Sequence, residues 1–287
     1  MTNTSADTRI PTTAPVASRI SAGAPATLPP LSTAVAGAPG GSGVLLAHGA
    51  TGSVRSNYGQ LIPALAASGH RVVAPDYPGS GDTPRATAPL TLDALADALV
   101  AEATAAGLAT FTLVGFSMGS AVSVRAAARH PERVRGLVLT AGLARADAHV
   151  TLWMDLWLRL LERGDYAGFA QARAVSGFSR EYLNGLSPQA LSTVLDPDPS
   201  LPPRGCAEQA ALVRAMDATA DLPGIRVPTL VIATTRDPLV PPSHSRHLAD
   251  RIPGAEYAEI ATGHLPMVEH PQKWQELIEG FLVRHRL

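Results

Sequence analysis

The sequence contains almost no cysteine: Cys206 is the single one among 287 residues. A lone cysteine excludes an internal disulfide and any zinc site built from several cysteines. Cys206 is therefore either a small buried residue or a reactive thiol. Net charge is also nearly absent, because 23 Lys and Arg offset 24 Asp and Glu and leave −1. Nucleic-acid binding needs a basic face that neutralises phosphates, so we expect no nucleic-acid partner.

Long apolar runs are missing as well. No uninterrupted apolar stretch reaches the roughly 20 residues of a membrane-spanning helix, so we expect no membrane partner. Residues 1–30 are rich in Thr, Ser, Ala and Pro and contain no aromatic residue. Such a stretch buries too little surface to offset its loss of conformational entropy, so we expect a flexible N-terminal arm. It has neither the basic start nor the apolar centre of a secretory signal, which favours a cytoplasmic location.

The remainder of the chain alternates between two patterns. Short apolar runs of the kind found in buried parallel strands occur at 44–47, 71–74, 111–114, 134–139 and 229–233, with weaker candidates at 31–36 and 256–260. Helical stretches lie between or after them, at 58–68, 91–107, 122–130, 243–251 and 271–284. This alternation predicts an α/β fold with a mostly parallel central sheet flanked by helices, formed by residues 31–144 and 223–287.

Residues 145–222 interrupt the alternation, because no strand-like run occurs there. An amphipathic helix is expected over 152–161 and another over 207–218. Such an insertion between two strands predicts a helical cap. Its aromatic side chains Trp153, Trp157 and Phe178 are candidate substrate contacts, and their apolar character suggests a small hydrophobic substrate.

The strongest chemical signal is Gly115-Phe116-Ser117-Met118-Gly119, directly after an apolar run and before a helix. This is the setting of the G-x-S-x-G turn, which raises a nucleophilic serine above a sheet edge. Because the turn is sharp, the residues two positions before and after the serine must be small. The N–H groups at the start of the following helix point to the same place.

A serine nucleophile needs backbone donors for the oxyanion that forms on attack. The loop His48-Gly49-Ala50-Thr51-Gly52 follows an earlier strand, and its small residues allow backbone N–H groups to approach a substrate.

The serine also needs a base, and the base needs an orienting acid. Asp237 directly follows the strand expected near 229–235, and His264 follows the one expected at 256–260. His270 is a rival base, but it precedes Pro271 at a helix start and fits a structural position better. The order Ser117, Asp237, His264 is the order of the α/β-hydrolases.

These pieces together resemble the α/β-hydrolase superfamily, in its single-cap branch of serine esterases, lactonases and perhydrolases. The matching segments run from about residue 40 to the C-terminus: His48-Gly49, 76–83, the turn at Ser117, 237–241, and Gly263-His264 with 269–271 beyond. The resemblance implies that Ser117 is the nucleophile, His264 the base and Asp237 the orienting acid. It also implies that the backbone N–H groups of Ala50 and Met118 form the oxyanion hole.

The sequence thus predicts a serine hydrolase that cleaves an ester, lactone or related acyl bond through an acyl-enzyme. An alternative uses the same residues for acyl elimination or cyclisation in small-molecule biosynthesis, and a third possibility is a ligand receptor on a hydrolase frame. No cofactor is implied. No metal site is expected either, since His244 and His247 share a helical face without a third ligand nearby. Substrate identity and oligomeric state stay open.

Overall fold

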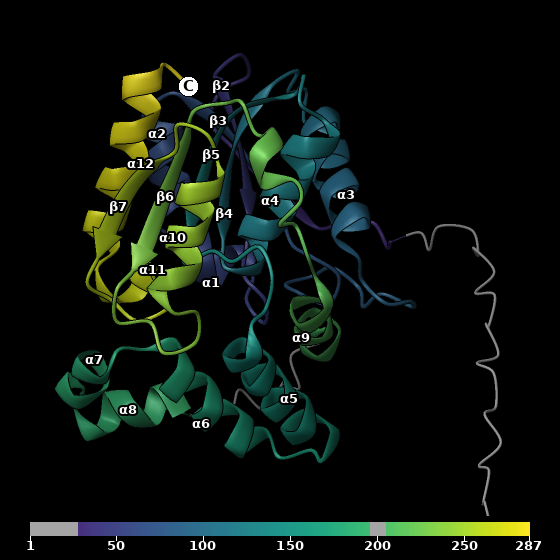
Figure 1. Ribbon diagram of the computed structural model, residues 1–287. Helices are drawn as coiled ribbons and strands as arrows, with labels where there is room; N and C mark the ends of the chain where they lie inside the picture. Colours follow the sequence, from purple (N-terminus) through teal and green to yellow (C-terminus); the bar gives the residue numbers. More distant parts are fainter. Residues whose placement is uncertain (1–27, 196–204) are drawn as a thin grey trace, which may run out of the picture.

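The computed structural model describes residues 28–195 and 205–287. Within them, a seven-stranded sheet runs in the order β1-β3-β2-β4-β5-β6-β7 (Figure 1). Every neighbouring pair is parallel except β1 with β3. The predicted α/β fold with a mostly parallel sheet is therefore confirmed. The predicted arm lies outside the described residues up to residue 27, and Leu28 already packs against the core.

The apolar runs form the strands, and five of the seven strands are one or two residues longer than predicted. Their bounds are β1 Thr33–Ala36, β2 Ser42–Ala47, β3 His70–Pro75, β4 Phe111–Phe116, β5 Val134–Thr140, β6 Thr229–Thr234 and β7 Glu256–Ile260. Alternate residues enter two different apolar clusters. In β2, for example, Leu45 and Ala47 face one cluster while Val44 and Leu46 face the other. Burial on both faces explains why these strands are continuous apolar runs.

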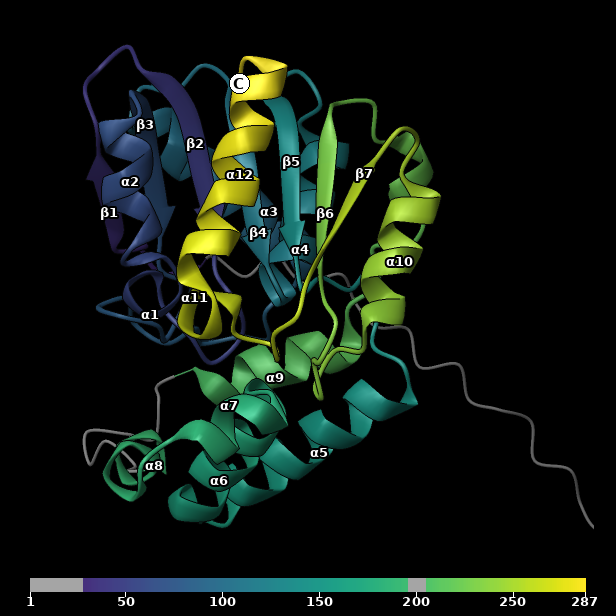
Figure 2. The same cartoon turned by 90° about the vertical axis from the view of Figure 1, so that its left-hand side faces the viewer.

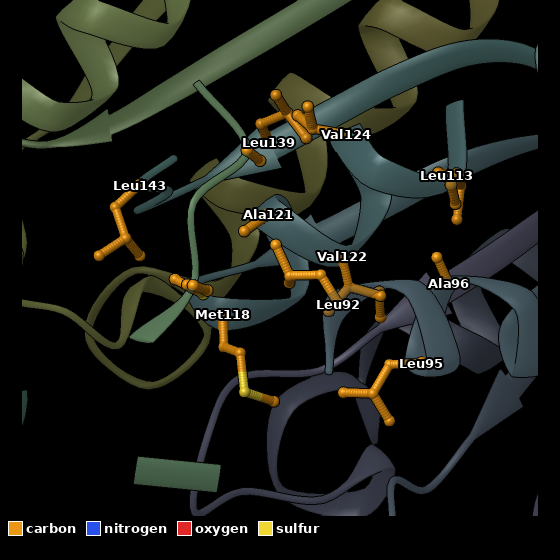
Figure 3. Close-up of a cluster of buried hydrophobic side chains, with 14 of the residues drawn as sticks. Leu92, Leu95, Ala96, Leu113, Met118, Ala121, Val122, Val124, Leu139 and Leu143 are labelled. Carbon is orange, nitrogen blue, oxygen red and sulfur yellow. The ribbon is translucent and has the colours of Figure 1, made fainter. Parts of the chain in front are cut away.

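Helices cover both faces of the sheet. One face packs against α3 Leu92–Ala105, α4 Met118–Arg129 and α10 Pro242–Arg251. The other packs against α1 Val54–Tyr58, α2 Leu61–Ala67, α11 Pro266–Glu269 and α12 Pro271–His285. Figure 3 shows part of the first cluster, where Leu95 and Ala96 of α3 lie beside Val122 of α4. Both faces are therefore dry, as a parallel sheet requires.

The single helix expected over 58–68 is wrong, because two short helices, α1 and α2, occupy this region. Pro63 accounts for the break. It has no N–H to donate to the carbonyl of Gly59, and its ring would collide with that carbonyl in a continuous helix. Proline is tolerated only in the first turn of a helix, and α2 accordingly begins at Leu61.

Between β5 and β6, the described residues form five helices, which lie as a separate layer below the strand ends in both views (Figures 1 and 2). We call them the cap: α5 Ala148–Glu162, α6 Tyr166–Gly177, α7 Arg180–Gly185, α8 Pro188–Leu195 and α9 Cys206–Ala215. A 3-10 turn, Leu222–Gly224, precedes β6. Arg145 and Asp217 form a β-bridge, so the chain enters and leaves the cap at adjacent points. We propose residues 145–222 as this unit.

Polar side chains at the N-termini of three helices of the cap show where those helices begin. Asp147, Asp165 and Ser179 each accept the backbone N–H three residues later, which starts α5, α6 and α7. None of the helices in the described parts of the chain has the length and apolar character needed to span a bilayer.

Candidate active site

Ser117 occupies a strained turn between β4 and α4, with φ 54° and ψ −122°. Its backbone N–H donates to the Thr140 carbonyl at 2.9 Å. A Cβ on Gly119 would lie 1.9 Å from the Ala47 carbonyl oxygen, and one on Gly115 would lie 2.6 Å from the Gly119 carbonyl oxygen. Only glycine fits at either position, which is the steric reason for the Gly-x-Ser-x-Gly pattern.

The predicted base and acid meet this serine in one hydrogen-bonded chain. His264 Nε2 lies 2.9 Å from Ser117 Oγ, and His264 Nδ1 lies 2.6 Å from Asp237 Oδ2. All three residues are buried, with no more than 7% of any one exposed. The geometry fits an imidazole that donates from Nδ1 to the carboxylate and accepts the serine proton at Nε2. The rival His270 lies instead between α11 and α12, at the helix junction.

The carboxylate of Asp237 is held by its own loop after β6. Its Oδ1 accepts the backbone N–H groups of Leu239 and Val240, both at 2.9 Å. Its Oδ2 accepts the Thr234 hydroxyl at 2.8 Å in addition to the imidazole. Four donors around one buried carboxylate fix its orientation.

The His264 loop is tied to the cap by Glu269. One oxygen of this carboxylate accepts the Gly263 N–H at 3.1 Å and the Ser179 N–H at 2.8 Å, and the other accepts the Ser179 hydroxyl at 2.7 Å. A Cβ on Gly263 would lie 2.2 Å from the Ser179 nitrogen, so the loop and the cap are in close contact. In the sequence, Glu269 belongs to one of the segments that resemble the α/β-hydrolases, but no pattern there predicts its contact with Ser179.

The loop after β2 is fixed by two side chains from different parts of the molecule. Asn57 of α1 accepts the Gly49 N–H at 3.0 Å, and Gln209 of the cap helix α9 accepts the Thr51 N–H at 2.7 Å. Thr51 has a positive φ of 59°, which is costly for a β-branched residue. Ala50 lies between these two anchored amides and lines the same cavity as Ser117.

Gln209 makes further contacts that sequence reasoning missed. It is 1% exposed, and its amide nitrogen donates to the Pro78 carbonyl at 3.2 Å and to the Ser80 hydroxyl at 2.9 Å. One cap side chain therefore holds both the loop after β2 and the turn after β3. Thr51 and Gln209 are 158 positions apart, so no local pattern could have revealed the contact.

His48 is a structural residue of the same loop. It donates from Nδ1 to the Gly49 carbonyl at 2.8 Å and accepts the Tyr77 N–H at Nε2 at 2.9 Å. Burial lowers the pKa of His48 to about 4, so the ring is neutral near pH 7. This neutral ring supports the loop and carries no charge towards Ser117.

A cavity of about 150 Å³ lies between the cap and the Ser117 turn. Its wall is mainly apolar and includes Leu143, Val150, Met154, Trp157 and Leu265, beside Ser117 and His264. Of the three aromatic candidates for substrate contact, Trp157 lines this cavity. Trp153 packs edge-on against His149, and Phe178 stacks on Tyr182; neither lines the cavity.

Cys206 begins α9 and is 2% exposed. Burial raises the pKa of its thiol to about 12, with the positive charge of nearby Arg173 acting in the opposite direction. A protonated, covered thiol favours the structural interpretation of this residue over the reactive one. His244 lies 3.1 Å from an Asp147 carboxylate oxygen. Within residues 28–195 and 205–287, no group of three or more His, Cys, Asp or Glu side chains is arranged to hold a metal ion.

A mostly parallel sheet with a buried Ser–His–Asp chain at its carboxyl edge, covered by a helical cap, is the architecture of capped α/β enzymes. A family model described as the alpha/beta hydrolase fold matches residues 44–271, and the chain belongs to this family of enzymes.

Two curated relatives align with most of this chain. The pyrrolizixenacetamide deacetylase of Xenorhabdus hominickii is 36% identical over 245 residues, covering 85% of this chain and 91% of the relative. A pimeloyl-[acyl-carrier protein] methyl ester esterase of Neisseria meningitidis is 31% identical over 254 residues, covering 83% of this chain and 76% of the relative.

Among solved structures, the enol-lactonase of Burkholderia xenovorans matches the fold with a TM-score of 0.79. It is 24% identical, and the match covers 88% of this chain and 96% of the lactonase. This likeness concerns the fold alone.

Proposed function

We propose that the protein is a serine hydrolase that cleaves an ester, lactone or related acyl bond of a small hydrophobic molecule through an acyl-enzyme. The observation that carries this proposal is the chain from Ser117 through His264 to Asp237, with links of 2.9 and 2.6 Å beside an apolar cavity. The names of the two curated relatives, a deacetylase and a methyl ester esterase, support hydrolysis at an acyl group.

In the first half-reaction, Ser117 Oγ attacks the acyl carbonyl carbon while its proton passes to His264 Nε2. Asp237 stabilises the imidazolium that results. Collapse of the tetrahedral intermediate breaks the bond to the alcohol or amine, which takes the proton from Nε2 as it leaves. The acyl group stays bound to the serine oxygen.

Negative charge develops on the carbonyl oxygen during this attack. We assign its stabilisation to the backbone N–H groups of Ala50 and Met118. Met118 is the first residue of α4, so its backbone N–H has no acceptor within the helix and lies at the positive end of the helix dipole. The contacts of Gly49 and Thr51 with Asn57 and Gln209 support a fixed position for Ala50 between them. Donors held in place before the reaction need no reorganisation when the charge forms.

In the second half-reaction, a water molecule gives a proton to His264 Nε2 and attacks the acyl carbon. The proton then returns to Ser117 Oγ as the acid product leaves. Each of these steps uses side chains and backbone groups of the chain, with no cofactor. A cytoplasmic location stays a prediction from the sequence.

The test is hydrolysis of p-nitrophenyl acetate by the wild type and by Ser117→Ala. We expect a loss of about 10³-fold or more in kcat, because removing a nucleophile leaves only binding and oxyanion stabilisation. Ser123→Ala is the matched control, since Ser123 is a buried serine of α4, the helix that follows Ser117, and its hydroxyl donates to the Gly119 carbonyl. Mass spectrometry of rapidly quenched wild type should find an acetyl group on Ser117. Equal rates in wild type and Ser117→Ala would remove this serine from the mechanism.

A further inference from the structure

Arg173 of cap helix α6 lies in the wall of the same cavity as Ser117 and His264. It is partly buried, and its guanidinium carbon lies 5.8 Å from the centre of the Phe169 ring. That distance allows a cation–π contact, which holds the guanidinium without consuming its N–H donors. The side chain thus lines the cavity, and no hydrogen bond joins its guanidinium to any other group in the described part of the chain, so its N–H donors are available to a ligand.

No carboxylate among residues 28–195 and 205–287 forms an ion pair with Arg173. Arg214, in contrast, is also a cap arginine and pairs with Asp155 of α5 at 2.7 Å. Among residues 28–195 and 205–287, the cavity wall contains no Asp, Glu or Lys, and Arg173 is its one arginine. A guanidinium in an apolar, partly dry site is stabilised most by an anion that accepts two parallel N–H bonds.

We propose that Arg173 binds a carboxylate of the substrate, so that the natural substrate is an acyl compound that also carries a free carboxylate. This inference rests on the proposed serine hydrolase, because it places the scissile carbonyl at Ser117 and the carboxylate at the cap side of one cavity. The guanidinium suits a planar carboxylate because its fork of donors matches the two oxygens. A cavity of about 150 Å³ holds a group of roughly benzene size, which fits a short chain ending in a carboxylate.

The proposal is tested by equilibrium binding, which needs no turnover. The chain carrying Ser117→Ala is titrated with valerate and with valeramide, two molecules of almost equal shape that differ in charge. Dissociation constants are taken from the rise in melting temperature with ligand concentration. We expect valerate to bind at least about tenfold tighter than valeramide, as a charge-assisted contact predicts.

Three further variants in the same background assign that preference to one side chain. Arg173→Met should bring the two dissociation constants together, and Arg173→Lys should retain part of the preference, because the charge stays while the fork of donors is lost. Arg159→Met is the matched control, since Arg159 is an exposed cap arginine outside the cavity wall. It should leave the preference unchanged.

Two results would overturn the proposal: no preference for valerate, or a preference that survives Arg173→Met. The experiments distinguish a failure of the proposed serine hydrolase from a failure of the carboxylate site at Arg173. If Ser117→Ala still hydrolyses p-nitrophenyl acetate, the nucleophile is wrong whatever valerate does. If Ser117→Ala is inactive but valerate has no advantage, only the carboxylate site is wrong.

Discussion

In the core, backbone amides and tightly packed glycines hold the candidate site together with the side chains of Asn57 and Glu269, whereas the cap reaches the site mainly through single polar side chains. Asp237 is held by the amides of its own loop, and Gly119 packs its Cα against the Ala47 carbonyl. The cap reaches the same site through Gln209, Ser179 and His149, whose ring donates to the Pro238 carbonyl at 2.8 Å.

Each of these three cap contacts meets a different loop at the carboxyl edge of the sheet. This difference between core and cap predicts where the chain tolerates amino-acid substitution. The core contacts leave no room for an added atom, so substitution there should act as an all-or-none change. The cap contacts are separate hydrogen bonds, so substitution there should give graded effects.

The largest effect is expected from adding a single methyl group to the core. Gly119→Ala places a Cβ against the Ala47 carbonyl oxygen, so β2 or the Ser117 turn must move. We expect the free energy of unfolding to fall by about 3 kcal/mol or more, together with loss of ester hydrolysis. Urea unfolding and p-nitrophenyl acetate turnover measure both.

The matched change in the cap is Gly185→Ala. Gly185 ends α7 and has no atom within 4 Å of its added Cβ. We expect a change in unfolding free energy of no more than about 1 kcal/mol and unchanged turnover. Similar losses at Gly119 and Gly185 would mean that the contrast between core and cap is wrong.

A smaller effect is expected from Gln209→Ala, which frees the Thr51 N–H. The loop that contains Ala50 then loses its cap anchor, so we expect kcat to fall about 10- to 100-fold, with a smaller change in KM. Gln209→Glu keeps an acceptor for Thr51 but places a second acceptor against the Pro78 carbonyl, so it should recover only part of the rate.

Glu208→Gln provides the control for Gln209→Ala. Glu208 is the preceding residue of α9 and pairs with Arg85, which is 58% exposed, at the surface. An exposed pair contributes little to stability, so this variant should keep wild-type kinetics. If Gln209→Ala also kept wild-type kcat, the anchor would have no role in the reaction.

The smallest effect concerns pH and His48. Its pKa is about 4 in the folded chain, because burial disfavours the charged ring, against 6.5 in an exposed histidine. The unfolded chain therefore binds the proton more readily, and stability falls as the pH drops through 6.5 towards 4. Between pH 6.5 and pH 5 the expected loss is about 1.5 kcal/mol.

Urea unfolding at these two pH values measures that loss. His48→Gln, which has no titrating group at this position, should show a smaller drop between them. An equal drop in both proteins would assign the pH dependence to other groups.

The sequence predicted the core well because its signals are local. A buried parallel strand is a continuous apolar run, and a strained serine turn demands glycine two residues to either side, so both can be recognised within ten residues. The ends of three strands then place Ser117, Asp237 and His264 on one edge of the sheet, which the structure brings within hydrogen-bonding distance. The one helix predicted wrongly contains Pro63, a residue whose position within a helical turn decides whether the helix continues.

The cap was harder to predict for a physical reason. The amphipathic pattern of α5 gave the helix but did not distinguish Trp157, in the cavity wall, from Trp153, one turn earlier and outside it. No local sequence pattern marks Gln209 or Arg173. A glutamine or arginine that lies inside a contact has the same sequence surroundings as one that is exposed on a helix. Their surroundings depend on how the cap packs on the core. That packing is determined by contacts between residues more than a hundred positions apart in the sequence.

The order of the strands along the chain also determines when the proposed nucleophile gains its base. Ser117 follows β4, but its imidazole partner follows β7, the last strand of the sheet to leave the ribosome. A chain that ends before β7 also lacks His264, so in the proposed mechanism its Ser117 hydroxyl has no proton acceptor. Under the proposed mechanism, the hydroxyl therefore gains its base only after the last strand has joined the sheet, which makes completion of the fold a condition for acyl transfer.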